Sequence, residues 1–245
     1  MILIVLPAFN EEGSIGPLLE AIRRAMHEQG ELAYRAVVVN DGSWDRTAEV
    51  VGQFEGIMPL ELISHPVNRG LAETLKTGLM HVLQKCEESD VVVTMDADNT
   101  HTPDLIIRML LLIDSGHDVV IASRYQRGAR VIGVPAYRRL LSFGASLLFR
   151  AFFPIHGVRD YTCGYRAYRA DALKRAVDLY GDDFINQRGF SCMVDILLKF
   201  RRLGLSITEV PLVLRYDLKH GMSKMKVVRT IRETLALIVK RAIRG

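Results

Sequence analysis

The sequence predicts an α/β protein with a mostly parallel central sheet that is flanked by helices. Through the first 125 residues, short runs of apolar and β-branched residues alternate with longer segments of helical periodicity. This alternation is typical of parallel strands whose connecting helices cover the sheet. Polar residues also gather directly after several of the apolar runs, which is the edge where open parallel sheets bind ligands.

Five apolar runs of the first half are expected as strands, because each is short, rich in branched residues and bounded by turn residues. They cover residues 2–6, 36–39, 60–64, 91–95 and 118–122. The segments between them are expected as helices, with Ser14 capping the first and Thr102-Pro103 opening the last. These helices cover residues 14–29, 46–54, 71–85 and 103–113.

The second half of the chain has fewer regular signals. Its expected elements are a helix over 137–153, a loop and strand over 160–168, a helix over 190–203, a strand over 206–213 and a basic loop over 215–226. The 137–153 helix is rich in Leu and Phe but also carries arginines. It therefore suits either a core helix or a helix that lies in the headgroup region of a membrane.

Residues 224–245 are expected to form a basic amphipathic helix after a catalytic domain of residues 1–223. Apolar residues recur there at helical spacing, and basic residues lie on the other side. The apolar stripe consists of Val227, Ile231, Leu235, Ile238 and Ala242. Such a helix can lie on a membrane surface, or it can dock on the sheet or on a partner.

The composition predicts a globular protein, since 49% of its 245 residues are apolar and 24% are charged. Three cysteines without CxxC spacing indicate a reducing compartment, and neither a disulfide framework nor a zinc site. No run of 18 apolar residues occurs, so no membrane span is expected. The net charge of +4 is uneven, because basic residues concentrate in 137–169 and 215–245. Such segments face anionic lipid, phosphate ligands or nucleic acid.

Two carboxylates follow the apolar run Val91–Met95, with one residue between them. Because strand side chains repeat every two residues, Asp96 and Asp98 are expected to leave the strand end on the same side. Two like charges placed together are costly unless a cation lies between them. A hard divalent cation that holds a phosphate fits this position, since it takes one or two carboxylates plus substrate oxygens. Taken alone, the pair also suits a solvated turn.

Four polar segments follow one another along the chain. They are Pro-Ala-Phe-Asn-Glu (7–11), Asn-Asp-Gly-Ser-Trp-Asp-Arg-Thr (40–47), Asp-Ala-Asp-Asn-Thr-His-Thr-Pro (96–103) and Arg-Tyr-Asp-Leu-Lys-His-Gly-Met-Ser-Lys (215–224). Each is a weak signal by itself. Their order and spacing over nearly the whole chain resemble the inverting family 2 glycosyltransferases of GT-A fold, and in particular the dolichyl- or polyprenyl-phosphate mannosyltransferases.

The resemblance implies a GT-A-like fold and a site for a GDP- or UDP-linked sugar. The implied nucleotide contacts come from the first three segments and are Pro7, Ala8, Asn10, Glu11, Asn40, Asp41, Asp96 and Ala97. Asp98 is implied as the main ligand of Mg²⁺ or Mn²⁺, with Asp96 on the metal or the ribose. Asn40 stands where the family usually has Asp, which leaves guanine and uracil both open. Taken alone, the first two segments also suit a turn that leads into a helix and an ordinary Asx turn.

The resemblance also implies phosphate-binding residues. Arg124, Arg138 and Ser142 are similar in position to groups that grip the acceptor phosphate in the lipid-phosphate enzymes. Arg215, Ser223 and Lys224 resemble the loop that closes over the donor diphosphate, and Ser223 is also expected near the acceptor phosphate. The expected catalytic set is Asp96, Asp98, Arg215 and Lys224. Arginines near helix starts are also common as solvated surface residues.

The function implied is transfer of a hexose, mannose or glucose, to a polyprenyl- or dolichyl-phosphate lipid. The enzyme is expected to be peripheral on the cytoplasmic face of a membrane, or held there by an anchoring subunit. Two alternatives stay open: a saccharide or soluble hydroxyl acceptor with Asp195 as general base, and an inactive, membrane-associated subunit that binds a nucleotide-sugar. No nucleic acid is expected as a partner, because the chain lacks a recognition-helix or aromatic-platform signature.

Overall fold

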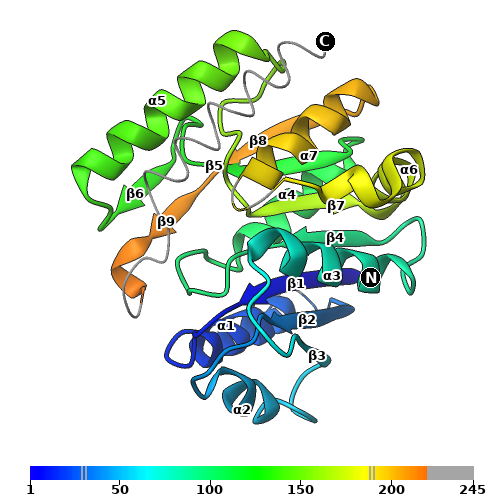
Figure 1. Cartoon of the computed structure of the whole chain (residues 1–245), viewed down its shortest axis with the longest axis vertical. Helices are drawn as coiled ribbons and strands as arrows, with labels where there is room; N and C mark the ends of the chain where they lie inside the picture. The colour runs from blue at the N-terminus through cyan, green and yellow to red at the C-terminus, as the bar shows by residue number, and fades with distance from the viewer. Residues whose placement is uncertain (29, 31, 188, 190, 220–245) are drawn as a thin grey trace.

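A seven-stranded sheet lies at the centre of the computed structural model, which describes residues 1–28, 30, 32–187, 189 and 191–219 (Figure 1). Its strands are β1 (Ile2–Ala8), β2 (Tyr34–Asn40), β3 (Leu60–Ser64), β4 (Val91–Thr94), β5 (Val119–Ser123), β7 (Arg166–Arg169) and β8 (Ile207–Pro211). They lie in the order β3-β2-β1-β4-β7-β5-β8. All neighbours pair in parallel except β7, which is antiparallel to β4 and β5. The predicted mostly parallel sheet is confirmed.

Helices flank this sheet (Figure 1). The described α-helices are α1 (Ile15–Glu28), α2 (Thr47–Gly52), α3 (Leu71–Leu83), α4 (Leu105–Asp114), α5 (Ala136–Phe152), α6 (Ala170–Tyr180) and α7 (Ser191–Arg202). Helix α3 packs against β1 and β2, and α4 packs against β5 and β7. The 3-10 turn η1 (Gly181–Ile185) contacts α3, α6 and α7, so these elements form one layer.

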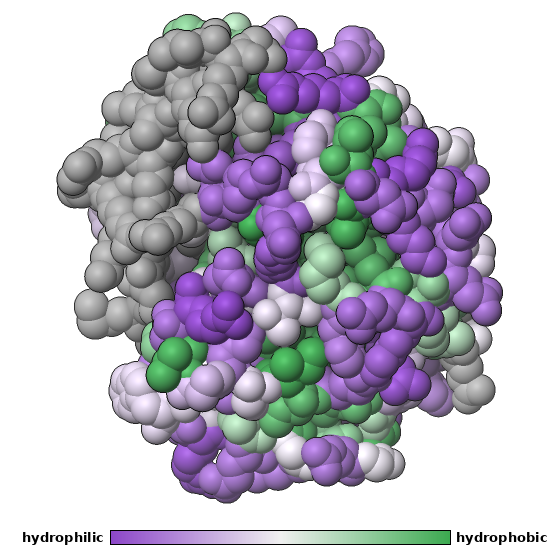
Figure 2. Space-filling view, turned by 45° about the vertical axis from the view of Figure 1, so that its right-hand side comes forward, coloured by the Kyte–Doolittle hydropathy of each residue, from purple (hydrophilic) through white to green (hydrophobic). Residues whose placement is uncertain are grey.

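The core lies between the sheet and its helices. Every residue of β4 and β5 is buried, and so is every residue of β1 except Pro7. Strands that are covered on both faces need apolar side chains in both directions, which is why they are continuous apolar runs in the sequence. On the face of the molecule in Figure 2, hydrophilic side chains predominate and apolar ones form a band between them.

Gly78 allows α3 to lie close to the sheet. A Cβ at this position would come within 2.4 Å of Cγ1 of Val5 and 3.1 Å of Cγ2 of Val39. Both neighbours are β-branched residues inside strands, so their side chains have little rotamer freedom with which to move away. The missing side chain therefore sets the distance between α3 and the two central strands.

Helix α5 lies at the edge of the molecule, beside a small parallel ribbon of β6 (Arg130–Ile132) and β9 (Val213–Arg215) (Figure 1). Only Ser146 and Phe149 of this helix are buried. Its other large apolar side chains are between 40% and 72% exposed, namely Tyr137, Leu140, Leu141, Phe143, Leu147, Leu148 and Phe152. The interpretation of this segment as a core helix is therefore wrong for most of its length.

Several parts of the observed secondary structure differ from the sequence expectation. The Ser14 hydroxyl is buried without a hydrogen-bond partner among the described residues, so it is not the cap of α1. Helix α4 begins at Leu105, two residues after the expected Pro103. Helix α6 follows β7 directly and was not expected from the sequence. Small residues supply most of its buried face, and these give only a weak periodic signal.

Among the described residues, no helix is both long and apolar enough to cross a bilayer. The three cysteines are buried and unpaired. The boundary expected at 223 and the helix expected over 224–245 lie outside the described residues.

Candidate active site

The segments that the sequence analysis singled out meet at the carboxyl edge of the sheet. The loops after β1, β2 and β4 are neighbours there, because these three strands are adjacent and parallel. The chain returns to the same edge at the end of β9, where the backbone N–H of Arg215 donates to the carbonyl oxygen of Thr100 at 2.9 Å. Residues far apart in the sequence therefore surround the Asp-x-Asp segment.

Asp96 is half-buried at the base of this edge. Burial raises the pKa of its carboxyl group above the usual value, and the charge of Asp98 acts in the same direction. Its backbone N–H donates to Nδ1 of His101 at 3.3 Å, and the His101 ring stacks on Tyr165 with centroids 5.0 Å apart. Gly164, just before β7, lies against this carboxylate, since a Cβ there would be in ordinary contact with Oδ1 of Asp96 at 3.4 Å.

Asp98 is held by two partners. Its Oδ1 accepts hydrogen bonds from the backbone N–H and the hydroxyl of Thr100, at 3.2 and 2.6 Å. Its Oδ2 accepts a hydrogen bond from the ammonium group of Lys219. Burial acts to raise the pKa of Asp98, but the charges of Lys219 and His101 and the hydrogen bonds from Lys219 and Thr100 together hold it below the usual value. Asp98 is thus an ionised carboxylate with a protein cation beside it.

Asp96 and Asp98 are hard oxygen donors of the kind that bind Mg²⁺ and Mn²⁺. The described part of the chain contains no group of three or more His, Cys, Asp or Glu side chains that could hold a metal ion. A cation bound between the two carboxylates would therefore take further ligands from a substrate or from water. The donor set fits a site that is completed by a diphosphate.

The first two predicted nucleotide segments are joined by hydrogen bonds. The backbone N–H of Asn10 donates to Oγ of Ser43 at 2.9 Å, and Oδ1 of Asn10 accepts from the backbone N–H of Trp44 at 3.1 Å. The backbone N–H of Glu11 donates to the Thr47 hydroxyl at 2.8 Å. Asn10 has a φ of 52°, a left-handed conformation that asparagine tolerates better than most residues. The two loops therefore form one wall of the site.

Asn40 and Asp41 are buried within this wall. Oδ1 of Asn40 accepts from the backbone N–H of Ser43 at 3.1 Å, which is the Asx turn considered as the alternative. The Asp41 carboxylate accepts from the backbone N–H groups of Arg69 and Gly70 at 2.9 and 2.8 Å, and it lies 2.8 Å from Nδ1 of His65. These contacts order the loop before α3. Direct nucleotide contacts by Asn40 and Asp41 stay predictions.

Pro7, Ala8 and Ala97 have small apolar side chains. They would contact a ligand through their backbone atoms or through these side chains. Pro7 lines a small pocket together with Asp96, between the ends of β1 and β4 and helix α7. The carbonyl oxygen of Ala8 accepts from the backbone N–H of Asp41 at 2.8 Å, and Ala97 is buried. Ala8 and Ala97 therefore help to shape the edge between the nucleotide wall and the two carboxylates.

Arg124 has a structural partner that the sequence did not indicate. Its Nε and Nη2 donate to the two oxygens of the fully buried Asp160 at 2.8 and 2.7 Å, and Nη2 also donates to the Thr162 hydroxyl at 2.6 Å. Burial acts to raise the pKa of Asp160, but the charge of Arg124 and the hydrogen bonds from Arg124 and Thr162 together hold it below its usual value. The geometry supports a role in ordering the 160–162 loop and gives no support to the predicted phosphate contact.

Arg138 links α5 to the carboxyl edge. Its Nη1 donates to the Tyr216 hydroxyl at 2.9 Å, and the Tyr216 ring lies 5.7 Å from the Lys219 ammonium group. Ser142, one helical turn on, accepts from the Tyr125 hydroxyl at 2.8 Å. Arg138 thus lies one side chain away from the partner of Asp98, and its acceptor-phosphate role stays a prediction.

Arg215 is at the edge of the site, but its guanidinium group is paired with Asp217 at 2.8 Å. Both side chains are more than one third exposed, so this pair is screened by solvent and easily exchanged. Ser223 and Lys224, which were expected to act with Arg215, lie outside the described residues.

Comparison with known proteins identifies the family. The family model described as "Glycosyl transferase family 2" matches residues 3–176. The chain belongs to glycosyl transferase family 2. This family 2 protein is 34% identical over 225 residues to an undecaprenyl-phosphate mannosyltransferase of Micrococcus luteus, covering 91% of this chain and 87% of the relative. It is 33% identical over 224 residues to a dolichol-phosphate mannosyltransferase of Pyrococcus furiosus, covering 91% of this chain but only 58% of the relative's length.

Solved structures confirm the GT-A-like fold. A glucosyl-3-phosphoglycerate synthase of Mycobacterium tuberculosis, crystallised with Mn²⁺, UDP and glucosyl-3-phosphoglycerate, superposes on the family 2 protein with a TM-score of 0.68. The alignment covers 99% of this chain and 80% of that one, at 23% identity. At this identity the likeness concerns the fold alone.

Asp195 of the family 2 protein is fully buried and paired with Lys199 at 2.6 Å, one helical turn along α7. The Lys199 ammonium group also donates to the carbonyl oxygens of Asp183 and Phe184. The pair ties α7 to η1, and this environment gives no support to its alternative role as a general base.

Lys219 is the site residue that sequence reasoning missed. It belongs to the fourth segment, but a lysine in a basic loop is by default a solvated side chain. The available signal was its place four residues after Arg215, in a segment that resembles a diphosphate-binding loop of the family.

Proposed function

We propose that this family 2 glycosyltransferase moves a hexose, mannose or glucose, from a GDP- or UDP-linked sugar to a polyprenyl- or dolichyl-phosphate, with inversion at the anomeric carbon. The observation that carries the proposal is the position of the Asp96–Asp98 segment. The joined nucleotide wall follows the neighbouring strands β1 and β2, and Lys219 pairs with Asp98 next to Tyr216 and Arg138. The carboxylate pair thus adjoins both a wall suited to a nucleotide and cationic side chains suited to phosphate.

Charge neutralisation at the leaving diphosphate is the main catalytic contribution expected from this site. Asp96 and Asp98 would hold Mg²⁺ or Mn²⁺, which supplies Lewis-acid stabilisation of the diphosphate when bound. Arg215 and Lys224 add positive charge as negative charge develops on the departing group. The Arg215–Asp217 pair is exposed, so Arg215 can exchange this partner for a phosphate oxygen at little cost.

A phosphate acceptor agrees with the environment of Asp195, the carboxylate considered as a general base. A phosphate monoester is ionised at neutral pH and attacks without a general base, whereas a sugar hydroxyl needs one. Asp195, the one candidate base that the sequence offered, is buried in an ion pair with Lys199. Arg138 and Ser142 lie one helical turn apart on α5, where they can bind the acceptor phosphate and orient its attack. The relatives named as mannosyltransferases of undecaprenyl and dolichol phosphate support this acceptor class.

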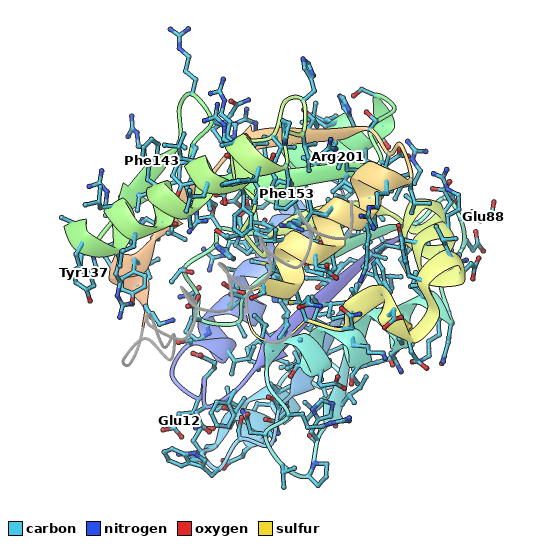
Figure 3. The ribbon with its side chains drawn as sticks, turned by 45° about the horizontal axis from the view of Figure 1, so that its top comes forward. Glu12, Glu88, Tyr137, Phe143, Phe153 and Arg201 are labelled. Atoms are coloured by element: carbon cyan, nitrogen blue, oxygen red, sulfur yellow. The ribbon has the colours of Figure 1, made fainter. Side chains whose placement is uncertain are left out.

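Helix α5 supports peripheral binding to a membrane surface. Its exposed apolar side chains, such as Tyr137 and Phe143 at the edge of the molecule in Figure 3, lie on the helix that also carries Arg138. An amphipathic helix of this kind lies in the headgroup region, with its apolar side chains in the acyl boundary. We propose the cytoplasmic face as the location, with an anchoring subunit as a further partner.

A screen of nucleotide-sugars tests the proposed reaction. Purified protein is incubated with GDP- or UDP-linked mannose or glucose and polyprenyl phosphate, with Mn²⁺, with Mg²⁺ or with chelator, and glycolipid is measured by mass spectrometry. One donor is expected to yield glycolipid in the presence of metal. Transfer only to soluble saccharides would reject the lipid acceptor, and donor binding without turnover of any donor would favour the inactive subunit.

A further inference from the structure

The ion pair between Lys219 and Asp98 occupies the position that a divalent cation would need. The Lys219 ammonium group donates to Oδ2 of Asp98, while Thr100 occupies Oδ1. The two charged side chains are only 12% and 14% exposed. Both oxygens of the predicted main metal ligand are therefore bonded within the protein.

Lys219 also neutralises more than one carboxylate. Burial acts to lower the pKa of Lys219, but the charge of Asp98, the hydrogen bond to Asp98 and the charges of Glu11 and Tyr216 together raise it above the usual value. Asp96 lies two residues from Asp98 and feels the Lys219 charge as well. Like charges placed this close together need a counter-charge. Lys219 provides it from within the chain.

We propose that Lys219 is a built-in counter-ion of the Asp96–Asp98 pair, which leaves Asp98 when a divalent cation binds there. This inference rests on the cation site of the proposed function. Oδ2 of Asp98 cannot accept the ammonium hydrogen bond and ligate a metal from the same direction. Binding of the metal and the position of the Lys219 side chain are therefore coupled, and each weakens the other.

The backbone around Lys219 permits this exchange without a large rearrangement. The backbone N–H of Arg215 is hydrogen-bonded to Thr100, and the Tyr216 hydroxyl is held by Arg138. The four-carbon stem of Lys219 can therefore turn away while the segment before it stays in place. Once released, the ammonium group remains beside the site, where a diphosphate would bring new negative charge. The Lys219 ammonium group then neutralises the carboxylates before a metal binds, and it neutralises the leaving diphosphate afterwards.

Binding of Mn²⁺ alone tests the competition. The protein, without nucleotide or lipid, is titrated with Mn²⁺, and the free ion is measured by electron paramagnetic resonance. Lys219→Met is expected to bind Mn²⁺ roughly ten-fold more tightly than the wild type, which corresponds to about 1.4 kcal/mol. Lys85→Met is the matched control, because Lys85 pairs with Glu61 at the opposite end of the sheet. Equal affinity of Lys219→Met and wild type, or no measurable binding by Lys219→Met, overturns the inference.

The rate of lysine acylation measures the release of Lys219 from Asp98 in the wild-type protein. The rate at which an amine-reactive ester labels Lys219 is measured by peptide mass spectrometry, with Lys76, which pairs with Asp182, as the internal control. Labelling of Lys219 is expected to become faster when Mn²⁺ is added, and to be equally fast in Asp98→Asn without metal. Unchanged protection of Lys219 at saturating Mn²⁺ overturns the inference.

These tests use neither sugar donor nor lipid, so they are independent of the transfer reaction. Tighter Mn²⁺ binding by Lys219→Met, together with no glycolipid from the wild type, would support the counter-ion and reject the proposed acceptor. Glycolipid formation by the wild type, together with equal Mn²⁺ affinity of Lys219→Met and wild type, would support the proposed acceptor and reject the counter-ion.

Discussion

Asp98 and Asp195 are both aspartates paired with a lysine, yet the two pairs differ in what surrounds them. The Asp195–Lys199 pair lies within one helix, is 1% and 3% exposed, and also satisfies carbonyl groups of η1. The Asp98–Lys219 pair joins two loops at the edge where ligands bind, and more of it reaches solvent. A closed pair supports structure, whereas a pair at an open edge can be exchanged for a ligand.

Replacing Asp195 tests this distinction at the residue scale. In Asp195→Asn the Lys199 ammonium group stays buried without its charged partner, which is expected to cost about 3–5 kcal/mol of unfolding free energy. Turnover per folded molecule is expected to stay close to that of the wild type. Urea unfolding and glycolipid formation measure the two effects, and the double variant Asp195→Leu/Lys199→Met is expected to recover part of the stability. A loss of turnover of about 10²–10⁴-fold with normal stability would instead indicate a general base.

Asp98 is expected to behave in the opposite way. Asp98→Ala removes a metal ligand and leaves Lys219 at a partly open edge, so the fold is expected to tolerate it. Glycolipid formation is expected to fall by about 10²–10³-fold, the cost of losing one group that stabilises transition-state charge. Circular dichroism verifies the fold, and initial rates at saturating Mn²⁺ measure the loss. Full activity of a folded Asp98→Ala in the presence of chelator would contradict the proposed mechanism.

At the scale of elements, two glycines in helices have different surroundings. A Cβ on Gly78 would meet Val5 and Val39, whereas a Cβ on Gly144 of α5 would meet nothing within 4 Å. Gly78→Ala is expected to destabilise the protein by about 1–3 kcal/mol through overpacking. Gly144→Ala is expected to stabilise it by about 0.5–1 kcal/mol, because alanine restricts the unfolded chain. Urea denaturation of both variants measures the difference, and equal effects would contradict the tight packing of α3.

Glu61 connects three elements, since it contacts Arg35 of β2 and both His81 and Lys85 at the end of α3. Lys85, with His81 and against a smaller effect of burial, lowers the pKa of Glu61 to about 2. A carboxylate whose pKa is lower in the folded state stabilises the fold above its unfolded pKa of about 4.3, and this contribution is lost as the pH falls to about 2. The stability gap between wild type and Glu61→Gln is therefore expected to close as the pH falls from about 5 to about 2. Denaturant midpoints measured across this range test it, and a gap that does not change with pH would contradict the contacts of Glu61.

The sequence predicted the strands well because their physical cause is local. Both faces of the inner strands are covered, so the apolar runs are continuous, and the polar residues after them mark the carboxyl edge. Helix α6 was not predictable in this way, because its buried face uses mainly alanines. The partners of Arg124 and Asp98 could not be predicted either. Asp160 and Lys219 lie 36 and 121 residues away in the sequence, and only the tertiary fold brings them together.

At the scale of the whole molecule, α5 connects the candidate site with an exposed apolar surface, from which the proposed lipid acceptor would come. Arg138 on this helix reaches Tyr216 beside Lys219, while the apolar side chains of the same helix are exposed. A lipid phosphate that binds near Arg138 needs an apolar route for its chain, and the exposed side of α5 provides one. Under the proposed function, this arrangement would place the reaction at a membrane surface.

Vesicle binding tests this arrangement. Leu140 and Leu147 are 72% and 54% exposed on α5, so replacing them with aspartate costs little folding free energy but places charge where acyl chains would lie. Leu140→Asp/Leu147→Asp is expected to lower binding to vesicles that contain phosphatidylglycerol, and to raise the KM for polyprenyl phosphate more than it lowers kcat. Leu179→Asp on α6 is the matched control, because Leu179 is 62% exposed on a helix outside this surface. Co-sedimentation measures binding, and a short-chain, water-soluble polyprenyl phosphate separates membrane docking from chemistry. If the α5 variant and the Leu179 control sediment equally with vesicles, α5 is not the membrane-facing element.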